Sequence, residues 1–236
     1  MDKWQSIWSK KDLGPNSTIS LGDLIVANGF DTGVGSYNEE SWRTMVADFC
    51  NRVALKKDSN VLEIGCGSGA FILACSEINK ANYFGFDYSQ SLIEIAKKQI
   101  PSGHFVVAEA NELTFLDTKF DVIFSHGVFF YFPNQQYVET VLKKYTDRIV
   151  VGGKLVLMDL NDAKFEKVYH SKRRSLYLRP DDYEKDYEDL EHLFFDKHEI
   201  ERYLRSLGMD KFEYFPHAVK SYGNAQFRFN MICTKT

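Results

Sequence analysis

Val61-Leu62-Glu63-Ile64-Gly65-Cys66-Gly67-Ser68-Gly69-Ala70 is the stretch that decides the fold of this 236-residue chain. Four residues typical of a buried strand lead into three closely spaced glycines, after which a helix is expected to begin. A turn of this kind points backbone N–H groups and a helix N-terminus at open space, and glycine has no Cβ atom to keep a ligand away. The stretch therefore predicts a nucleotide-type binding loop.

An acidic residue follows at the end of the next apolar strand. Asp87 ends the segment Phe84-Gly85-Phe86-Asp87 and lies eighteen positions beyond Gly69. Its two carboxylate oxygens can accept both hydroxyls of a ribose bound over the glycine turn. The alternative is a helix cap, a role that Ser89 can equally fill.

Strands and helices alternate around these motifs. Strands are expected at 60–64, 83–86, 104–108, 120–125 and 154–160, and helices at 39–55, 68–78, 90–99 and 134–146. Short apolar strands separated by helices indicate an α/β fold with a parallel sheet that is covered on both faces. A helix at 197–206 and two strands, near 211–215 and around 227–233, are expected to follow. Residues 1–38 are predicted to form a short helix and then a loop from Leu13 to Tyr37.

In these motifs and their order, the chain resembles the class I S-adenosylmethionine-dependent methyltransferases. The resemblance implies a Rossmann-like seven-stranded sheet, mostly parallel, with a C-terminal antiparallel hairpin and helices on both faces. It also implies that S-adenosyl-L-methionine is the cofactor. The residues that would contact it are Glu63, Gly65, Cys66, Gly67, Gly69, Asp87, Tyr88, Glu109, Ala110, Asn111, Ser125 and His126.

Each group has an expected role under this resemblance. Glu109 or Asn111 would accept from the adenine amino group, and the Ala110 N–H would donate to a ring nitrogen. The family usually has Asp where this chain has Glu109. The backbone near Ser125 and His126 would meet the methionine moiety, next to the methyl group that is transferred.

The chain divides into four expected regions. Residues 1–40 form an N-terminal helix and a lid, in which Gly29 to Tyr37 would close over the methyl group. Residues 41–160 form the cofactor-binding core. Residues 161–195 form a charged, tyrosine-rich insertion that roofs the substrate pocket, and residues 196–236 add a helix and hairpin to the same domain.

The composition limits the kinds of partner that the chain is expected to bind. There are 29 basic and 33 acidic residues, so the formal net charge is -4, which offers no bulk attraction to nucleic acid or an anionic membrane. No segment approaches the roughly 18 apolar residues of a membrane span. Four scattered cysteines suggest neither a metal site nor a disulfide framework, and a cytoplasmic protein is expected. The sequence leaves the oligomeric state open between a monomer and a homodimer.

Three side chains are candidates for the catalytic role. His126 follows the fourth strand, His192 ends the insertion, and Tyr131 has a phenol that can orient a hydroxyl or phosphate. The sequence does not rank them, and positioning alone is enough when the nucleophile is already good. Arg228, on a terminal strand, is a candidate to pair with a phosphate or carboxylate of the substrate.

The acceptor is expected to be small and polar. The [DNS]PPY motif of base-amine methyltransferases is absent, because Ser125-His126-Gly127-Val128 stands in its place. The chain ends contain Trp4, Ile7-Trp8, Asn28-Gly29-Phe30-Asp31, Gly33, Gly35 and Trp42, and later Tyr222-Gly223-Asn224 and Arg228-Phe229-Asn230. In these residues the chain resembles a bacterial small-molecule subgroup linked to surface-glycan and capsule decoration, which implies methylation of a hydroxyl or phosphate oxygen of a sugar, sugar nucleotide or glycan precursor. The alternatives are an RNA methyltransferase and a non-catalytic cofactor-binding partner subunit. An NAD-dependent oxidoreductase is disfavoured by the glycine spacing.

Overall fold

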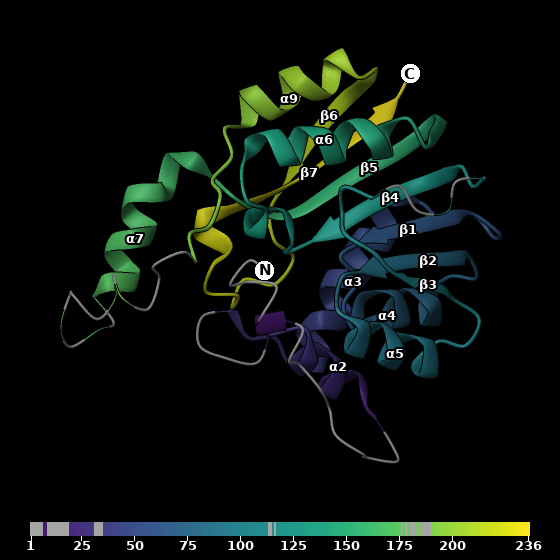
Figure 1. Cartoon of the computed structure of the whole chain (residues 1–236), viewed down its shortest axis with the longest axis horizontal. Coiled ribbons are helices and arrows are strands. Elements are labelled where there is room, and N and C mark those ends of the chain that lie inside the picture. The colour runs from purple at the N-terminus through teal and green to yellow at the C-terminus, as the bar shows by residue number, and fades with distance from the viewer. Residues whose placement is uncertain are drawn as a thin grey trace.

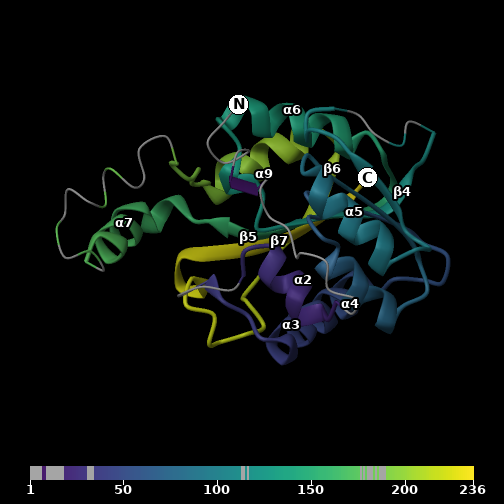
Figure 2. The ribbon, with the colours of Figure 1, turned by 60° about the horizontal axis from the view of Figure 1, so that its bottom comes forward.

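The computed structural model describes residues 7–8, 19–30, 35–112, 115, 117–175, 177, 179, 183, 185 and 190–236. Part of the predicted lid, residues 31–34, and much of the predicted roof between residues 176 and 189 lie outside the described residues. The described part forms one seven-stranded sheet with helices packed on it (Figures 1 and 2). The strands are β1 (Asn60–Ile64), β2 (Asn82–Asp87), β3 (His104–Val107), β4 (Phe120–His126), β5 (Ile149–Asn161), β6 (Met209–Phe215) and β7 (Arg228–Lys235).

The strand order is β3-β2-β1-β4-β5-β7-β6. The pairs among β1 to β5 are parallel, whereas β7 lies antiparallel between β5 and β6. This arrangement confirms the predicted sheet, including its antiparallel C-terminal strands. Because β1 to β5 run in one direction, their carboxyl ends meet along one edge, where ligands of such sheets bind.

Helices cover both faces of the sheet (Figure 1). One face packs against α2 (Leu21–Ala27), α3 (Glu39–Val53), α4 (Ala70–Ile78) and α5 (Gln90–Gln99). The other packs against α6 (Gln135–Thr146) and α9 (Lys197–Ser206). In β4, Val122 and Phe124 belong to the first core and Ile123 to the second. Both sides of the strand are therefore apolar, which explains its continuous hydrophobic run.

Helix α2 corrects the expectation of a loop from Leu13 to Tyr37. The Ser20 hydroxyl accepts from the Asp23 N–H, and the Asp23 carboxylate accepts in return from the Ser20 N–H, which makes a capping box. Leu21, Leu24 and Ile25 are buried on one side of the helix. The prediction was wrong because seven residues are too few for a clear helical period, and tertiary burial stabilises the helix instead.

The insertion leaves and rejoins the sheet at one place. The Phe195 N–H donates to the Asn161 carbonyl at 2.8 Å, and the Ala163 N–H donates to the Phe195 carbonyl at 3.0 Å. Between these points, α7 (Glu166–Arg174) extends away from the sheet in both views (Figures 1 and 2). None of the described helices is long and apolar enough to cross a membrane.

Candidate cofactor and acceptor site

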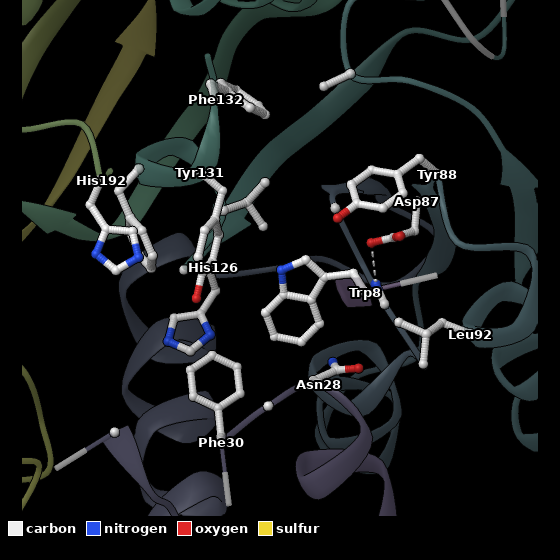
Figure 3. A pocket seen from close by; sticks show the side chains of 18 of the residues that line it. Trp8, Asn28, Phe30, Asp87, Tyr88, Leu92, His126, Tyr131, Phe132 and His192 are labelled. Atoms are coloured by element: carbon white, nitrogen blue, oxygen red, sulfur yellow. Dashed lines mark hydrogen bonds between the residues drawn. The ribbon is translucent and has the colours of Figure 1, made fainter. Parts of the chain in front are cut away.

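A cavity of about 920 Å³ opens at the carboxyl edge of the parallel strands (Figure 3). This volume lies near the upper end of the roughly 300–1,000 Å³ range of ligand pockets, so it has room for a cofactor and a second molecule. The predicted residues that line it are Glu63, Gly65, Gly67, Asp87, Tyr88, Glu109, Ala110, His126, Tyr131, His192 and Arg228. The tertiary structure thus brings most of the predicted site together.

The glycine loop after β1 has a backbone that other residues rarely adopt. Gly65 and Gly67 have φ angles of +72° and +52°. A Cβ atom on Gly65 would lie 2.6 Å from Val128, and one on Gly67 would lie 2.4 Å from the side-chain oxygen of Asn28. Both glycines therefore allow the loop to adopt its left-handed backbone conformation and to pack closely against Val128 and Asn28. Gly69, with φ +83°, is the N-cap of α4.

Asp87 is held in place by the backbone around it. Its carboxylate oxygens accept from the Gly67 N–H at 3.0 Å and from the Ser89 N–H at 2.9 Å. Burial raises the pKa of this carboxyl to about 6, although these hydrogen bonds act in the opposite direction. The group is therefore ionised at neutral pH, fixed in orientation, and able to accept further hydrogen bonds from a ligand hydroxyl.

Glu63 lies beneath the glycine loop. Its side chain is buried, and no described residue makes a hydrogen bond with Oε2. Burial, and secondarily the nearby Asp87, raises the pKa of Glu63 well above its usual value. This carboxyl lines the cavity, and its Oε2 is available to bond a polar group of a ligand.

Only some of the residues expected to contact the adenine line the cavity. Tyr88, Glu109 and Ala110 line it, but Asn111 does not. The Asn111 N–H donates to the Tyr137 hydroxyl at 3.2 Å, and its carbonyl accepts from Lys144. Of the two side chains considered for the adenine amino group, Glu109 is therefore the better placed.

Cys66 and Ser125 lie behind the cavity wall. The Cys66 side chain is fully buried, and a Cβ atom on Gly85 would lie 2.8 Å from its sulfur. The Ser125 hydroxyl donates to the Ile64 carbonyl at 2.9 Å. Any contact of these two residues with a ligand is thus left to the backbone.

His126 ends β4 and lines the cavity with an imidazole that stacks on Phe30, at 5.1 Å between ring centroids. Burial lowers its pKa to about 4, so the ring is neutral at physiological pH. Among the described residues, none makes a hydrogen bond with Nε2. The ring can therefore accept a hydrogen bond from an acceptor hydroxyl.

His192 and Tyr131 lie together on the insertion side of the cavity. Their rings are 5.2 Å apart, and the His192 Nδ1 lies 3.0 Å from the Tyr169 hydroxyl. Burial lowers the pKa of His192 well below its usual value and raises that of Tyr131 above its usual range. Both groups are therefore neutral near pH 7 and suited to orienting an acceptor.

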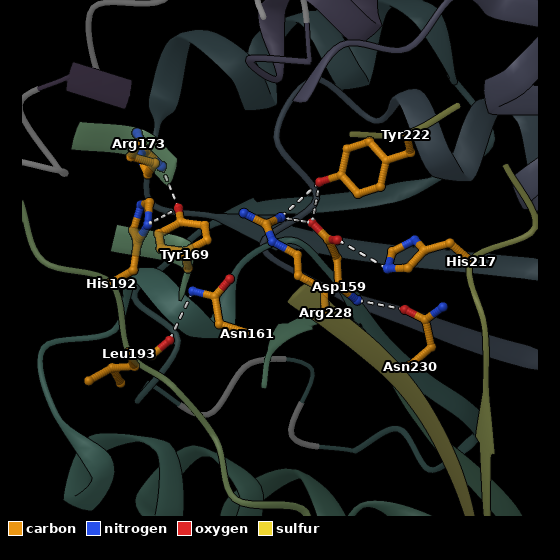
Figure 4. A network of polar contacts seen from close by, with 10 residues as sticks. All are labelled: Asp159, Asn161, Tyr169, Arg173, His192, Leu193, His217, Tyr222, Arg228 and Asn230. Carbon is orange, nitrogen blue, oxygen red and sulfur yellow. Dashed lines mark hydrogen bonds and ion pairs between the residues drawn. The ribbon is translucent and has the colours of Figure 1, made fainter. Parts of the chain in front are cut away.

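A buried polar network adjoins this end of the cavity (Figure 4). Asp159, on β5, pairs with Arg228 and accepts from the Tyr222 hydroxyl at 2.9 Å. His217 Nε2 lies 3.4 Å from the other Asp159 oxygen. Burial would raise the pKa of Asp159, but the neighbouring Arg228 guanidinium outweighs it and keeps this pKa below its usual value, so the ion pair persists at neutral pH.

Sequence reasoning missed two parts of this site. Asp159 has a φ angle of +65°, a strained backbone that no local pattern announces. Asn28 reaches across from α2, and its side-chain oxygen accepts from the Ser68 N–H at 2.8 Å. Both depend on contacts between distant segments. The described residues contain no cluster of three or more His, Cys, Asp or Glu side chains suited to a metal ion.

Known proteins share this architecture. Residues 61–153 match the family described as methyltransferase domain. The chain is 31% identical over 116 residues to a probable tRNA methyltransferase 9B of Bos taurus, matching 48% of this chain and 24% of that protein. It is 30% identical over 160 residues to the demethylmenaquinone methyltransferase of Thermotoga maritima, matching 66% of this chain and 62% of that protein.

A solved structure gives the same result for the fold. An amino pentose methyltransferase from Micromonospora echinaspora, with S-adenosylmethionine bound, superimposes with a TM-score of 0.64 at 11% identity, covering 94% of this chain and 99% of that one. The fold is thus the Rossmann-like fold of S-adenosylmethionine-dependent methyltransferases, and S-adenosylmethionine is the cofactor that corresponds to it.

Proposed function

We propose that this chain transfers a methyl group from S-adenosylmethionine to an oxygen of a small polar acceptor. The observation that carries the proposal is the position of the Asp87 carboxylate, fixed by the Gly67 N–H at one end of a cavity whose other end holds neutral imidazoles. When bound, the cofactor supplies an electrophilic methyl group on a sulfonium ion. The residues of this chain then have to bind it, orient the acceptor and receive or share a proton.

Asp87 would bind the ribose hydroxyls, with Tyr88, Glu109 and Ala110 around the adenine and Glu63 and the glycine loop nearer the methionine. His126 would accept a hydrogen bond from the reacting hydroxyl through Nε2. A pKa of about 4 makes this imidazole a weak base, so we assign it to orientation, and the proton of the reacting hydroxyl would pass to water as the oxygen–methyl bond forms and the sulfur–methyl bond breaks. His192 and Tyr131 would fix the rest of the acceptor, beneath a roof supplied by residues 161–195.

We propose a hydroxyl or phosphate oxygen of a sugar, sugar nucleotide or capsule or glycan precursor as the acceptor. The amino pentose named for the Micromonospora enzyme makes sugars the first class to screen. The curated relatives act on chemically different substrates by name, and the chain spans only 24% and 62% of the two described above.

The test is incubation of the protein with labelled S-adenosylmethionine and a panel of sugars, sugar nucleotides and RNA, followed by counting of label in each acceptor. Label in a sugar oxygen supports the proposal. Label in RNA would favour the RNA methyltransferase, and cofactor binding without label in any acceptor would favour a non-catalytic partner subunit. His126→Gln should lower kcat more than it changes the affinity for the cofactor.

A further inference from the structure

Charge is divided between the two ends of the cavity. The acidic side chains among its described lining residues are Glu63, Asp87 and Glu109, and its arginines are Arg173 and Arg228. The acidic side chains belong to β1, β2 and the loop after β3, whereas Arg228 begins β7 and Arg173 lies on α7. Since the sheet order is β3-β2-β1-β4-β5-β7-β6, the topology itself separates the acidic end from the basic end.

Arg228 uses only part of its hydrogen-bonding capacity within the protein. Nη1 makes the contacts with Asp159 and with the Tyr222 hydroxyl, the latter at 2.8 Å. No described residue accepts from Nε, and none of the described contacts involves Nη2. In a guanidinium group Nε–H and Nη2–H share one edge, on the side opposite Nη1, and this edge matches the two oxygens of a carboxylate or phosphate.

The arginine is held so that this edge keeps one direction. Its guanidinium lies 4.4 Å from the centre of the Phe130 ring, and its side chain is 5% exposed. Figure 4 shows one terminal nitrogen turned toward Asp159 and Tyr222 and the other turned away, toward the side on which Tyr169 and His192 lie. Little side-chain entropy remains to be lost when a ligand binds, which favours recognition by this edge.

We infer that the acceptor carries an oxyanion, a carboxylate or a phosphate, which binds to the Nε and Nη2 edge of Arg228. The inference rests on the proposed function and adds the chemical class of the acceptor. The anion serves as an anchor. It binds at the basic end of the cavity and leaves a separate polar atom of the acceptor to face His126.

The experiment uses the full chain loaded with S-adenosylhomocysteine in a low-chloride buffer, titrated separately with inorganic phosphate and with acetate. Arginine Nε–H resonances are followed by two-dimensional nitrogen-proton NMR. The Arg228 signal is identified by its loss in Arg228→Lys, a variant that keeps the positive charge beside Asp159. We expect this resonance to shift saturably with phosphate, acetate or both, and the responding anion identifies the chemistry.

Arg52 provides the matched control. Like Arg228 it stacks on an aromatic ring, 4.3 Å from the centre of Phe215, and pairs with carboxylates, but it does not line the cavity. Arg228→Lys should weaken the anion about tenfold or more, because one of two charge-assisted hydrogen bonds is lost, whereas Arg52→Lys should not. The loss is read from the main-chain amide shifts of the same titrations.

An Arg228 resonance that does not shift with either anion overturns the inference. If Arg228→Lys fails to fold, the Arg228 signal is assigned in the wild-type protein instead, through its contacts with neighbouring side chains. Equal shifts at Arg52 and Arg228 also overturn it, since they indicate nonspecific ion binding. If S-adenosylhomocysteine does not bind, the proposed function fails, and the titration of the unloaded protein still tests the Arg228 site.

Discussion

Asp87 links sequence, structure and function at the scale of a single residue. Its position at the end of β2 follows from local sequence, whereas its burial and its raised pKa follow from the packing around it. Two backbone N–H groups orient the carboxylate before any ligand arrives. This preorganisation leads to two predictions about the affinity for the cofactor.

The first prediction is that Asp87→Ala weakens S-adenosylmethionine binding strongly, by at least about tenfold, because the hydrogen bonds of an ionised acceptor to the ribose are lost. Isothermal titration calorimetry measures the change. Asp121→Asn is the control, because Asp121 accepts from the Asn60 N–H at 2.8 Å near the start of β4, away from the cavity. An unchanged affinity in Asp87→Ala would refute the ribose assignment.

The second prediction concerns pH. A carboxyl with a pKa of about 6 is ionised above that pH and protonated below it. If the cofactor prefers the ionised form, its affinity should be constant above pH 7 and fall as pH drops through 6, reaching about tenfold weaker one pH unit below the pKa. Calorimetry between pH 5 and 8 follows this change. The dependence of the cofactor affinity on pH should disappear in Asp87→Asn. If it persists in this variant, another titrating group is responsible.

At the scale of elements, the C-terminal end of α2 and Trp8 contribute to the lining of the cavity. Asn28, the C-cap of α2, bonds the Ser68 N–H and hydroxyl of the glycine loop, both at 2.8 Å. The Trp8 indole lies in the same cavity, 5.7 Å from the Tyr131 ring between centroids (Figure 3). Residues that precede the core in sequence thus contact its binding loop and line the same cavity.

The third prediction tests this contact. Gly67→Ala should lower the free energy of unfolding by about 1–2 kcal/mol from its left-handed backbone alone, and further because the new Cβ atom would lie 2.4 Å from the Asn28 side chain. Thermal and urea unfolding measure the loss. Asn28→Gly removes the obstructing side chain. The double variant should therefore lose less free energy of unfolding than the sum of the losses in the two single variants. Simple additivity would contradict the contact.

At the scale of the whole molecule, the net charge of -4 bears on the choice of partner. Within the described cavity the basic end holds arginines, but the chain as a whole offers no attraction to a polyanion. A small anionic acceptor that enters the cavity is compatible with both observations. A long nucleic acid that binds through its phosphates gains no attraction from the net charge.

The fourth prediction follows from this balance. The protein should show negligible affinity for a generic tRNA even at low salt, because too few phosphates would be neutralised to release counterions. Fluorescence anisotropy with labelled tRNA at 20 and 200 mM salt provides the measurement. Tight binding that weakens steeply with salt would instead favour the RNA methyltransferase alternative, and bovine serum albumin serves as an acidic control protein.

The sequence by itself determined the parts that depend on neighbours along the chain. The three glycines, the acidic residue at the end of the second strand and the alternation of apolar strands with helices all express local backbone and burial preferences, and they predicted the sheet correctly. Gln90–Gln99 and Lys197–Ser206 begin and end as expected because strong caps and amphipathic periods define them.

Only the tertiary structure decided the rest. Asp159 meets Arg228 because β5 and β7 pair antiparallel with a register irregularity between Leu157 and Leu160. Short α2 is stabilised by burial rather than by its own propensity. These features arise from contacts between residues that are distant in sequence, and local preferences carry no information about such contacts. The sequence therefore predicted the methyl donor, whereas the charge and shape of the acceptor end of the cavity depend on how the strands lie side by side in the tertiary structure.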